Sequence, residues 1–277
     1  MKAQTLDEVL AQLEIVIDKS VADKDRLGFF AVLYHTVTSR VKEGILNNEF
    51  DDNTRMENLD VTFANRYLDA LEKHNDSKET TASWAVAFKS AKKSSLLVLH
   101  HLLLGMNAHI NLDLGISAVD VMKSGELKKI QKDFNQINAI LSELTAELIN
   151  KINRISPLLS LLGLHATNNN SVFIQFAISN ARDGAWVFAE ELSEKTGDAI
   201  QTYIIERDEK IKRLAEGITQ ASFFLKLSIW FIHLFEWKNP AKIMTVLRQY
   251  KKSYFKVTES AIKVGTKTGS SVEIQPS

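Results

Sequence analysis

The chain has 277 residues, of which 45% are hydrophobic and 25% are charged, and it contains no cysteine. This composition excludes a largely disordered chain, a disulfide-stabilised protein and any site that needs a thiolate. The 34 basic residues balance the 34 acidic ones. The chain therefore lacks the positive field with which nucleic-acid binders attract phosphates, and we expect no nucleic-acid partner.

The N-terminal segment favours a cytoplasmic protein. Asp7 and Glu8 stand where a secretory signal would carry a basic end followed by an apolar run. Lengths up to about 250 to 300 residues can share one core. We therefore expect one helical domain over residues 1–264, followed by a flexible tail, 265–277, that is rich in Gly, Thr and Ser.

Apolar residues recur at helical intervals through most of the chain, whereas no segment alternates as a strand does. Thr5 and Glu8 have the spacing of a capping box before the first helix, and Asp60 is predicted as the N-cap of the third. We predict helices at 6–22, 27–46, 60–74, 84–91, 96–116, 127–155, 171–194, 197–216, 219–237 and 240–264. The predicted fold class is all-α, a single irregular multi-helix bundle around a buried central helix.

Two segments are apolar enough to raise the question of a membrane. Residues 96–116 include three histidines, two asparagines and an aspartate. These are too many polar groups to face lipid, so we predict an interior helix and no transmembrane segment. Residues 221–237 are rich in Phe and Trp but are interrupted by Lys226, His233 and Glu236. For them a core helix is favoured over a helix lying on a membrane surface.

The predicted central helix carries two polar seams. On a helical wheel His100, Asn107 and Asn111 share one narrow stripe, while His109 and Asp113 lie almost opposite, flanked by Gly105 and His101. A buried polar group without a partner costs about 1 to 3 kcal/mol. Either an internal network or a ligand must therefore form hydrogen bonds with these groups. Gly105 either admits a ligand or allows a neighbouring helix to pack closely.

His109 and Asp113 permit two interpretations, because their i, i+4 spacing places both side chains on one face. They can converge on a divalent metal such as zinc, for which His101 would be a third ligand. Alternatively they form an ordinary hydrogen bond that fixes the imidazole ring.

Two further clusters contain candidate residues. Asn65, Arg66 and Asp69 follow one another within a helical turn; Arg66 pairs either with Asp69 at the surface or with the buried Asp113. Arg182, Trp186 and Glu190 form a ladder of i, i+4 steps, which is either a surface ion pair or one wall of a pocket.

The sequence resembles a bacterial family known only as a domain of unknown function, over about residues 27–250. The motifs that carry the resemblance are FANRYLDA at 63–70, Trp84, HLLLGMNAHINLDL at 101–114, Ala181-Arg182 and Ala185-Trp186. It implies a shared helical fold and a shared polar centre, but no substrate. His109 and Asp113 are also similar to the His-x-x-x-Asp pair of all-helical zinc phospholipase C and nuclease proteins, whose partner His-x-x-x-Glu pair and N-terminal tryptophan ligand are absent here.

Three hypotheses about function follow. The chain is a metal-dependent hydrolase in which His109, Asp113, His101 and Asp69 activate water. Alternatively, it is a binding module for a small amphipathic ligand without catalysis, or its polar seam is a satisfied structural network. The residues predicted to contact a small-molecule ligand are Asn65, Arg66, His100, Asn107, Asn111, Arg182 and Trp186.

Overall fold

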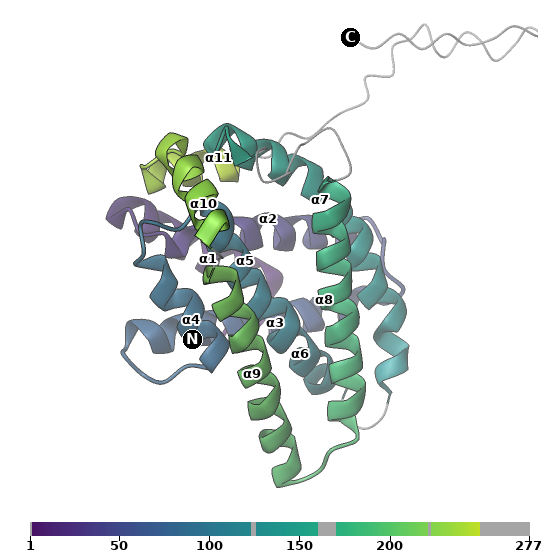
Figure 1. The fold of residues 1–277 in the computed structure, drawn as a ribbon. Coiled ribbons are helices and arrows are strands. Elements are labelled where there is room, and N and C mark those ends of the chain that lie inside the picture. The colour runs from purple at the N-terminus through teal and green to yellow at the C-terminus, as the bar shows by residue number, and fades with distance from the viewer. Residues whose placement is uncertain (1, 123–125, 160–169, 221–222, 250–277) are drawn as a thin grey trace, which may run out of the picture.

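The computed structural model describes residues 2–122, 126–159, 170–220 and 223–249, and every regular element within these ranges is helical (Figure 1). The helices are α1 (Leu6–Asp23), α2 (Leu27–Leu46), α3 (Asn53–Asn75), α4 (Ala82–Ala91), α5 (Val98–Ala108), α6 (Leu114–Val121), α7 (Gln131–Ile155), α8 (Asn170–Ser193), α9 (Asp198–Thr219), α10 (Phe223–Phe235) and α11 (Pro240–Arg248). A π-helical segment, His109–Asp113, joins α5 to α6, and a 3-10 turn, Leu127–Ile130, precedes α7. The all-α prediction is confirmed.

N-cap side chains fix the first residues of α1 and α3. The Thr5 hydroxyl accepts a hydrogen bond from the Glu8 backbone N–H, as the sequence predicts for α1. In α3 the carboxylate of Asp52 accepts from the Arg55 N–H, so this helix begins at Asn53. The prediction that Asp60 caps this helix is therefore wrong: Asp60 lies two turns inside α3 and is buried.

The central helix is the continuous element formed by α5, the π-helical segment and α6. It contacts α2, α3, α4, α8 and α9, which surround it (Figure 1). Among the described helices it is long and apolar enough to cross a membrane, but 72% of its most apolar window is buried inside the protein. It is the core helix of the bundle, as its polar residues predicted.

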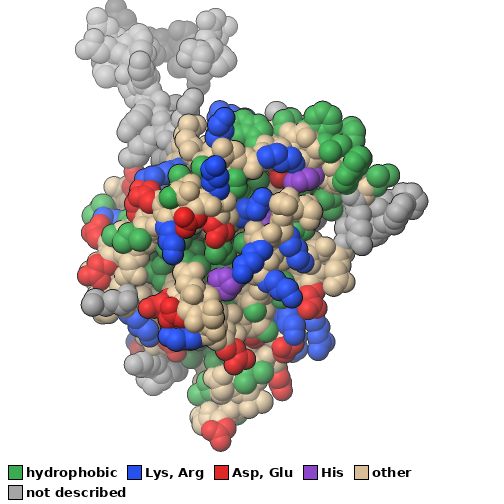
Figure 2. Space-filling model, turned by 90° about the vertical axis from the view of Figure 1, so that its left-hand side faces the viewer, with side chains coloured by type: hydrophobic (Ala, Val, Ile, Leu, Met, Phe, Trp, Pro, Cys, Tyr) green, Lys and Arg blue, Asp and Glu red, His purple; other side chains and the backbone are tan. Residues whose placement is uncertain are grey.

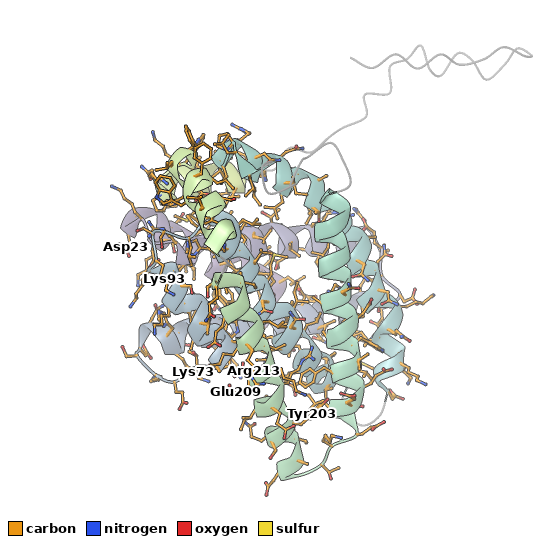
Figure 3. All side chains as sticks on the ribbon, in the orientation of Figure 1. Asp23, Lys73, Lys93, Tyr203, Glu209 and Arg213 are labelled. Carbon is orange, nitrogen blue, oxygen red and sulfur yellow. The ribbon has the colours of Figure 1, made fainter. Side chains whose placement is uncertain are left out.

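The asparagine seam of the central helix fastens α9. Asn107 donates from its side-chain amide to the Ile211 carbonyl at 3.0 Å and accepts from the Asn111 amide at 3.1 Å. Arg207 of α9 donates to the Asn111 carbonyl at 3.1 Å. Tyr203 of the same helix points toward α8 (Figure 3), where its ring centroid lies 5.5 Å from that of Phe188. Asn107 and Asn111 thus hold the central helix and α9 together.

Gly105 allows α2 to approach the central helix closely. A Cβ at this position would lie 2.5 Å from the ring of Phe30, nearer than packed carbon atoms come. We predict that Gly105→Ala lowers the free energy of unfolding by about 1 to 3 kcal/mol, because the core must shift to admit the methyl group. In the control, Gly217→Ala near the end of α9, the methyl group meets nothing within 4 Å, and we expect it to stabilise by about 0.5 kcal/mol. Urea unfolding of both variants checks this; equal effects would contradict the packing described here.

Two predictions about the C-terminal part have different outcomes. The aromatic helix at 219–237, predicted to be a core element, exposes Trp230, Phe231 and Phe235 as α10, so that prediction is wrong. The last helix begins at Pro240 as expected and is described as far as Arg248. The rest of its predicted length and the tail, 265–277, lie outside the described residues.

Candidate functional site

Asp113 is the centre of the candidate site, and three helices bring it hydrogen-bond donors. Arg66 of α3 donates from Nε to Oδ1 at 3.0 Å, and Trp84 of α4 donates from Nε1 to Oδ2 at 2.8 Å. His109, one turn earlier, lies with Nδ1 3.2 Å from Oδ2. The inward position of Arg66 is one of the two alternatives that the sequence left open. The other, a pair with Asp69, is wrong because Asp69 pairs with Lys73 at 2.8 Å.

The protonation states of this cluster follow from its burial and contacts. Burial alone would raise the pKa of Asp113. The hydrogen bond from His109, the charge of Arg66 and the hydrogen bond from Trp84 outweigh it, so the pKa lies below its ordinary value. Burial lowers the pKa of His109 in spite of Asp113. At neutral pH a neutral imidazole therefore donates its Nδ1 proton to an ionised carboxylate, and its Nε2 atom carries a free lone pair.

Aromatic rings hold His109 in place. Its ring stacks on Phe63 with centroids 3.5 Å apart and planes 7° apart, and Tyr34 meets it edge to face at 4.5 Å. Its Nε2 atom is buried and has no hydrogen-bond partner. His109 is the first residue of the π-helical segment, in which the Leu114 N–H donates a hydrogen bond to the His109 carbonyl. Such segments are rare and often occur at functional sites.

An apolar cavity of about 90 Å³ opens on this face of His109. Apart from Asp60, His109, Thr145 and Arg182, its lining is aliphatic or aromatic. The half-buried lining residues belong to α2, α7 and the central helix, and we call this partly exposed side of the cavity its mouth: Leu33, Val37, Met106, Ile110, Leu141 and Leu148. The lining residues are Phe30, Leu33, Tyr34, Val37, Val41, Met56, Leu59, Asp60, Phe63, Met106, His109, Ile110, Leu114, Ile137, Leu141, Leu144, Thr145, Leu148 and Arg182.

Asp60 and Arg182 place opposite charges in this cavity. Both are buried, and Asp60 Oδ2 and Arg182 Nε lack hydrogen-bond partners. Burial raises the pKa of Asp60 to about 7, against the opposing charge of Arg182. Burial lowers the pKa of Arg182 to about 9. The guanidinium lies 4.4 Å from the centroid of the Phe134 ring and donates to the Phe134 carbonyl. Sequence reasoning missed Asp60, which it interpreted as a helix cap.

A polar cleft of about 360 Å³ lies on the other side of the His109–Asp113 pair. Asn65, Arg66, Asp69 and Asp113 line it, together with Trp84. The pair thus stands between this cleft, which Asp113 lines, and the apolar cavity, which His109 lines. A neutral imidazole backed by a carboxylate can accept a proton from a bound molecule and keep its orientation while it does so.

The remaining predicted residues have structural contacts of their own. Asn65 exchanges hydrogen bonds with the backbone of Ala3, both at 2.8 Å, and so tethers the N-terminal segment. His100 Nδ1 accepts from the Leu97 N–H at the start of α5. Trp186 is buried against Phe134, with ring centroids 5.1 Å apart. The surface ladder of Arg182, Trp186 and Glu190 is therefore wrong, and the pocket-wall alternative holds for Arg182.

The metal site predicted from His101, His109 and Asp113 is not found. In the part of the chain that the structure describes, no group of three His, Asp or Glu side chains could hold an ion. Both oxygens of Asp113 already accept hydrogen bonds, and Asp69 pairs with Lys73. His101 packs against Phe29 instead, with ring centroids 5.8 Å apart, and burial lowers its pKa to about 4.

Fold and site together define an all-helical protein with a buried His–Asp pair beside an apolar cavity. The chain belongs to a family of unknown function (DUF5995), which matches residues 6–221; the resemblance to such a family is confirmed. No curated protein and no solved structure matches the chain. The matched segment includes all the helices that line the cavity, whereas α10 and α11 lie beyond it.

Proposed function

We propose that this protein binds a small, largely apolar molecule whose polar head carries an O–H or N–H group. The observation that carries the proposal is the apolar cavity lined by His109, Asp60 and Arg182, each of which has a buried atom without a hydrogen-bond partner, namely Nε2, Oδ2 and Nε. This is the binding module that the sequence offered as an alternative: the polar head meets Arg182, a predicted ligand contact, and His109, together with Asp60, which was not predicted.

The energetic argument compares the two ways of satisfying these atoms. Each buried polar atom without a partner costs about 1 to 3 kcal/mol, and four such atoms belong to residues that line this cavity, the Tyr34 hydroxyl oxygen being the fourth. A ligand with polar atoms at one end satisfies them and also covers the aliphatic and aromatic walls, which water does not. A mostly apolar pocket with a few converging polar groups is the usual form of a small-molecule site.

The polar atoms indicate the chemistry of the head. Nε2 of neutral His109 accepts a hydrogen bond, so the ligand must donate one. Nε of Arg182 donates, so the ligand must also accept. A hydroxyl group does both. The cavity is smaller than the roughly 150 Å³ that admits benzene in an engineered protein core, so the head and the first carbon atoms fill it and a longer chain extends through the mouth.

Metal-dependent hydrolysis, the other function predicted from the sequence, has less support. The lone pairs of Asp113 that would hold an ion face Arg66, Trp84 and His109. Binding through His109 Nε2 needs no metal and uses the atom that the network leaves free.

The proposal is tested with untagged protein from its native cells by native mass spectrometry and by thermal unfolding. We expect a bound small molecule that is released by organic solvent. We also expect n-octanol to raise the melting temperature more than its isomer heptyl methyl ether, which lacks the O–H donor. Leu141→Phe at the mouth should abolish both effects, whereas Leu46→Phe, whose side chain is 72% exposed, should leave them unchanged.

Two results would contradict the proposal. One is a protein that carries no ligand and melts at the same temperature in either compound. The other is equal stabilisation of the wild type and Leu141→Phe, which would place binding elsewhere.

A further inference from the structure

The outward face of α10 is an exposed apolar surface. Leu227, Trp230, Phe231, Leu234 and Phe235 are each between 44% and 57% exposed, whereas Ile232 on the opposite face is fully buried. Figure 2 shows hydrophobic side chains gathered at the corner of the molecule where α10 lies, with Lys and Arg side chains beside them. Single exposed apolar residues are common on proteins, but a contiguous cluster indicates a surface that meets something other than water.

A basic pocket of about 210 Å³ adjoins this face. Arg26, His233 and Lys238 line it, and Trp237 forms part of its wall. Burial lowers the pKa of His233, and the positive charges of Lys238 and Arg26 lower it further, so both charges act on the pocket that these side chains line. On the rim of this side, Figure 3 places Lys93 together with the acidic Asp23.

Glu236, the one carboxylate that lines the basic pocket, is held by hydrogen bonds and lies 3.9 Å from the ring of His233. Glu236 accepts hydrogen bonds from the Val98 N–H at 3.1 and 3.2 Å and from the Ser156 hydroxyl. Neither Arg26 nor Lys238 forms an ion pair with a carboxylate among the described residues. The pocket therefore presents positive charge directly beside an apolar helix face.

We propose that the outward face of α10 and this basic pocket dock the protein onto a membrane surface that contains anionic phospholipids. Helices with Trp, Phe and Leu on one face lie at the boundary between headgroups and acyl chains. Basic residues beside them attract anionic headgroups. The helix α10 and Lys238 lie beyond the segment that matches the family, which ends at residue 221, whereas Arg26 lies within it.

Two other occupants fit the charges less well. A second copy in a two-fold dimer would bring two basic pockets toward each other. Residues 250–277 contain five lysines and only two acidic residues, so they carry the same sign of charge as the pocket. An anionic bilayer complements both the apolar face and the charge.

Vesicle sedimentation with the full chain tests this proposal. We expect binding to phosphatidylcholine vesicles that contain phosphatidylglycerol, with weaker binding to pure phosphatidylcholine. Joint replacement Trp230→Ser, Phe231→Ser and Phe235→Ser should abolish binding, whereas Ile15→Ser with Leu46→Ser, both exposed on other helices, should not. Arg26→Gln with Lys238→Gln should weaken binding to the anionic vesicles roughly thirtyfold. Circular dichroism confirms that each variant is folded.

The proposal is overturned if the wild type binds neither kind of vesicle or if the triple Ser variant binds as the wild type does. It is also overturned if light scattering shows a dimer that the triple Ser variant disperses, since the face would then bind a second copy. A blue shift of tryptophan emission on anionic vesicles, absent in the triple Ser variant, supports it. These results are independent of the ligand cavity.

Discussion

Asp113→Ala is expected to destabilise the protein by about 3 to 5 kcal/mol. The carboxylate is almost completely buried and accepts hydrogen bonds from Arg66, Trp84 and His109. Its removal leaves two buried N–H groups without partners, each at a cost of about 1 to 3 kcal/mol. Arg66 adds less, because its side chain is 27% exposed and can reach water. Denaturant unfolding measured at constant pH gives the value.

Asp69→Asn is the matched control for Asp113→Ala. Asp69 lines the same polar cleft, but its ion pair with Lys73 is nearly half exposed on both sides. We expect a change below about 0.5 kcal/mol. Asp113→Asn, which keeps one acceptor oxygen, should fall between the two. A small effect of Asp113→Ala would mean that the three donors find other partners, and the central network described here would be wrong.

Asp60→Asn is expected to change how stability depends on pH. Burial raises the folded-state pKa of Asp60 from 3.8 to about 7. Between these values the folded protein keeps a proton that the unfolded chain has released, so this group makes stability fall as the pH rises from about 4 to about 7. Above that window its contribution is constant. The difference in unfolding free energy between variant and wild type should shift in favour of the variant by on the order of 4 kcal/mol across the window.

The measurement is urea unfolding of both proteins at several pH values on either side of this window. Comparing the two profiles removes the contribution of other groups, and also the constant cost of leaving Arg182 without its negative neighbour. Parallel profiles would show that Asp60 titrates as it does in the unfolded chain, and the cavity would then be wetter than its lining indicates.

The sequence predicted the parts of this protein that depend on periodicity. Most helices appear within a few residues of their predicted bounds, and the central helix is buried because its wheel is apolar on nearly every side. The two polar seams were also predictable, since wheel position alone separates Asn107 and Asn111 from His109 and Asp113. The inward ion pair of Arg66 was one of two alternatives, and only the packing of α3 against α6 decides between them.

Asp60 was misinterpreted for a physical reason. An aspartate before an apolar run has the pattern of an N-cap, but Asp52 stands earlier and caps α3 first, which moves Asp60 into the helix and toward the cavity. Its partner in charge, Arg182, lies more than a hundred residues away, and no local pattern joins them.

The aromatic helix α10 shows that composition alone does not predict which side chains are buried. Phe and Trp predict burial because burying them is favourable. Whether a neighbour covers them depends on the arrangement of the other helices, and among the described side chains of α10 it is Ile232 that is buried. The metal prediction failed similarly, because spacing brings two ligands together but does not show that Trp84 and Arg66 already occupy the carboxylate.

The most direct test of the central claim is a high-resolution crystal structure of the untagged protein purified from its native cells. We predict continuous non-protein density in the cavity between α2, α3 and α7, with a donor atom within hydrogen-bond distance of His109 Nε2. A cavity in which ordered water molecules alone bridge His109, Asp60 and Arg182 would contradict the claim, since the polar atoms would then be satisfied without a ligand.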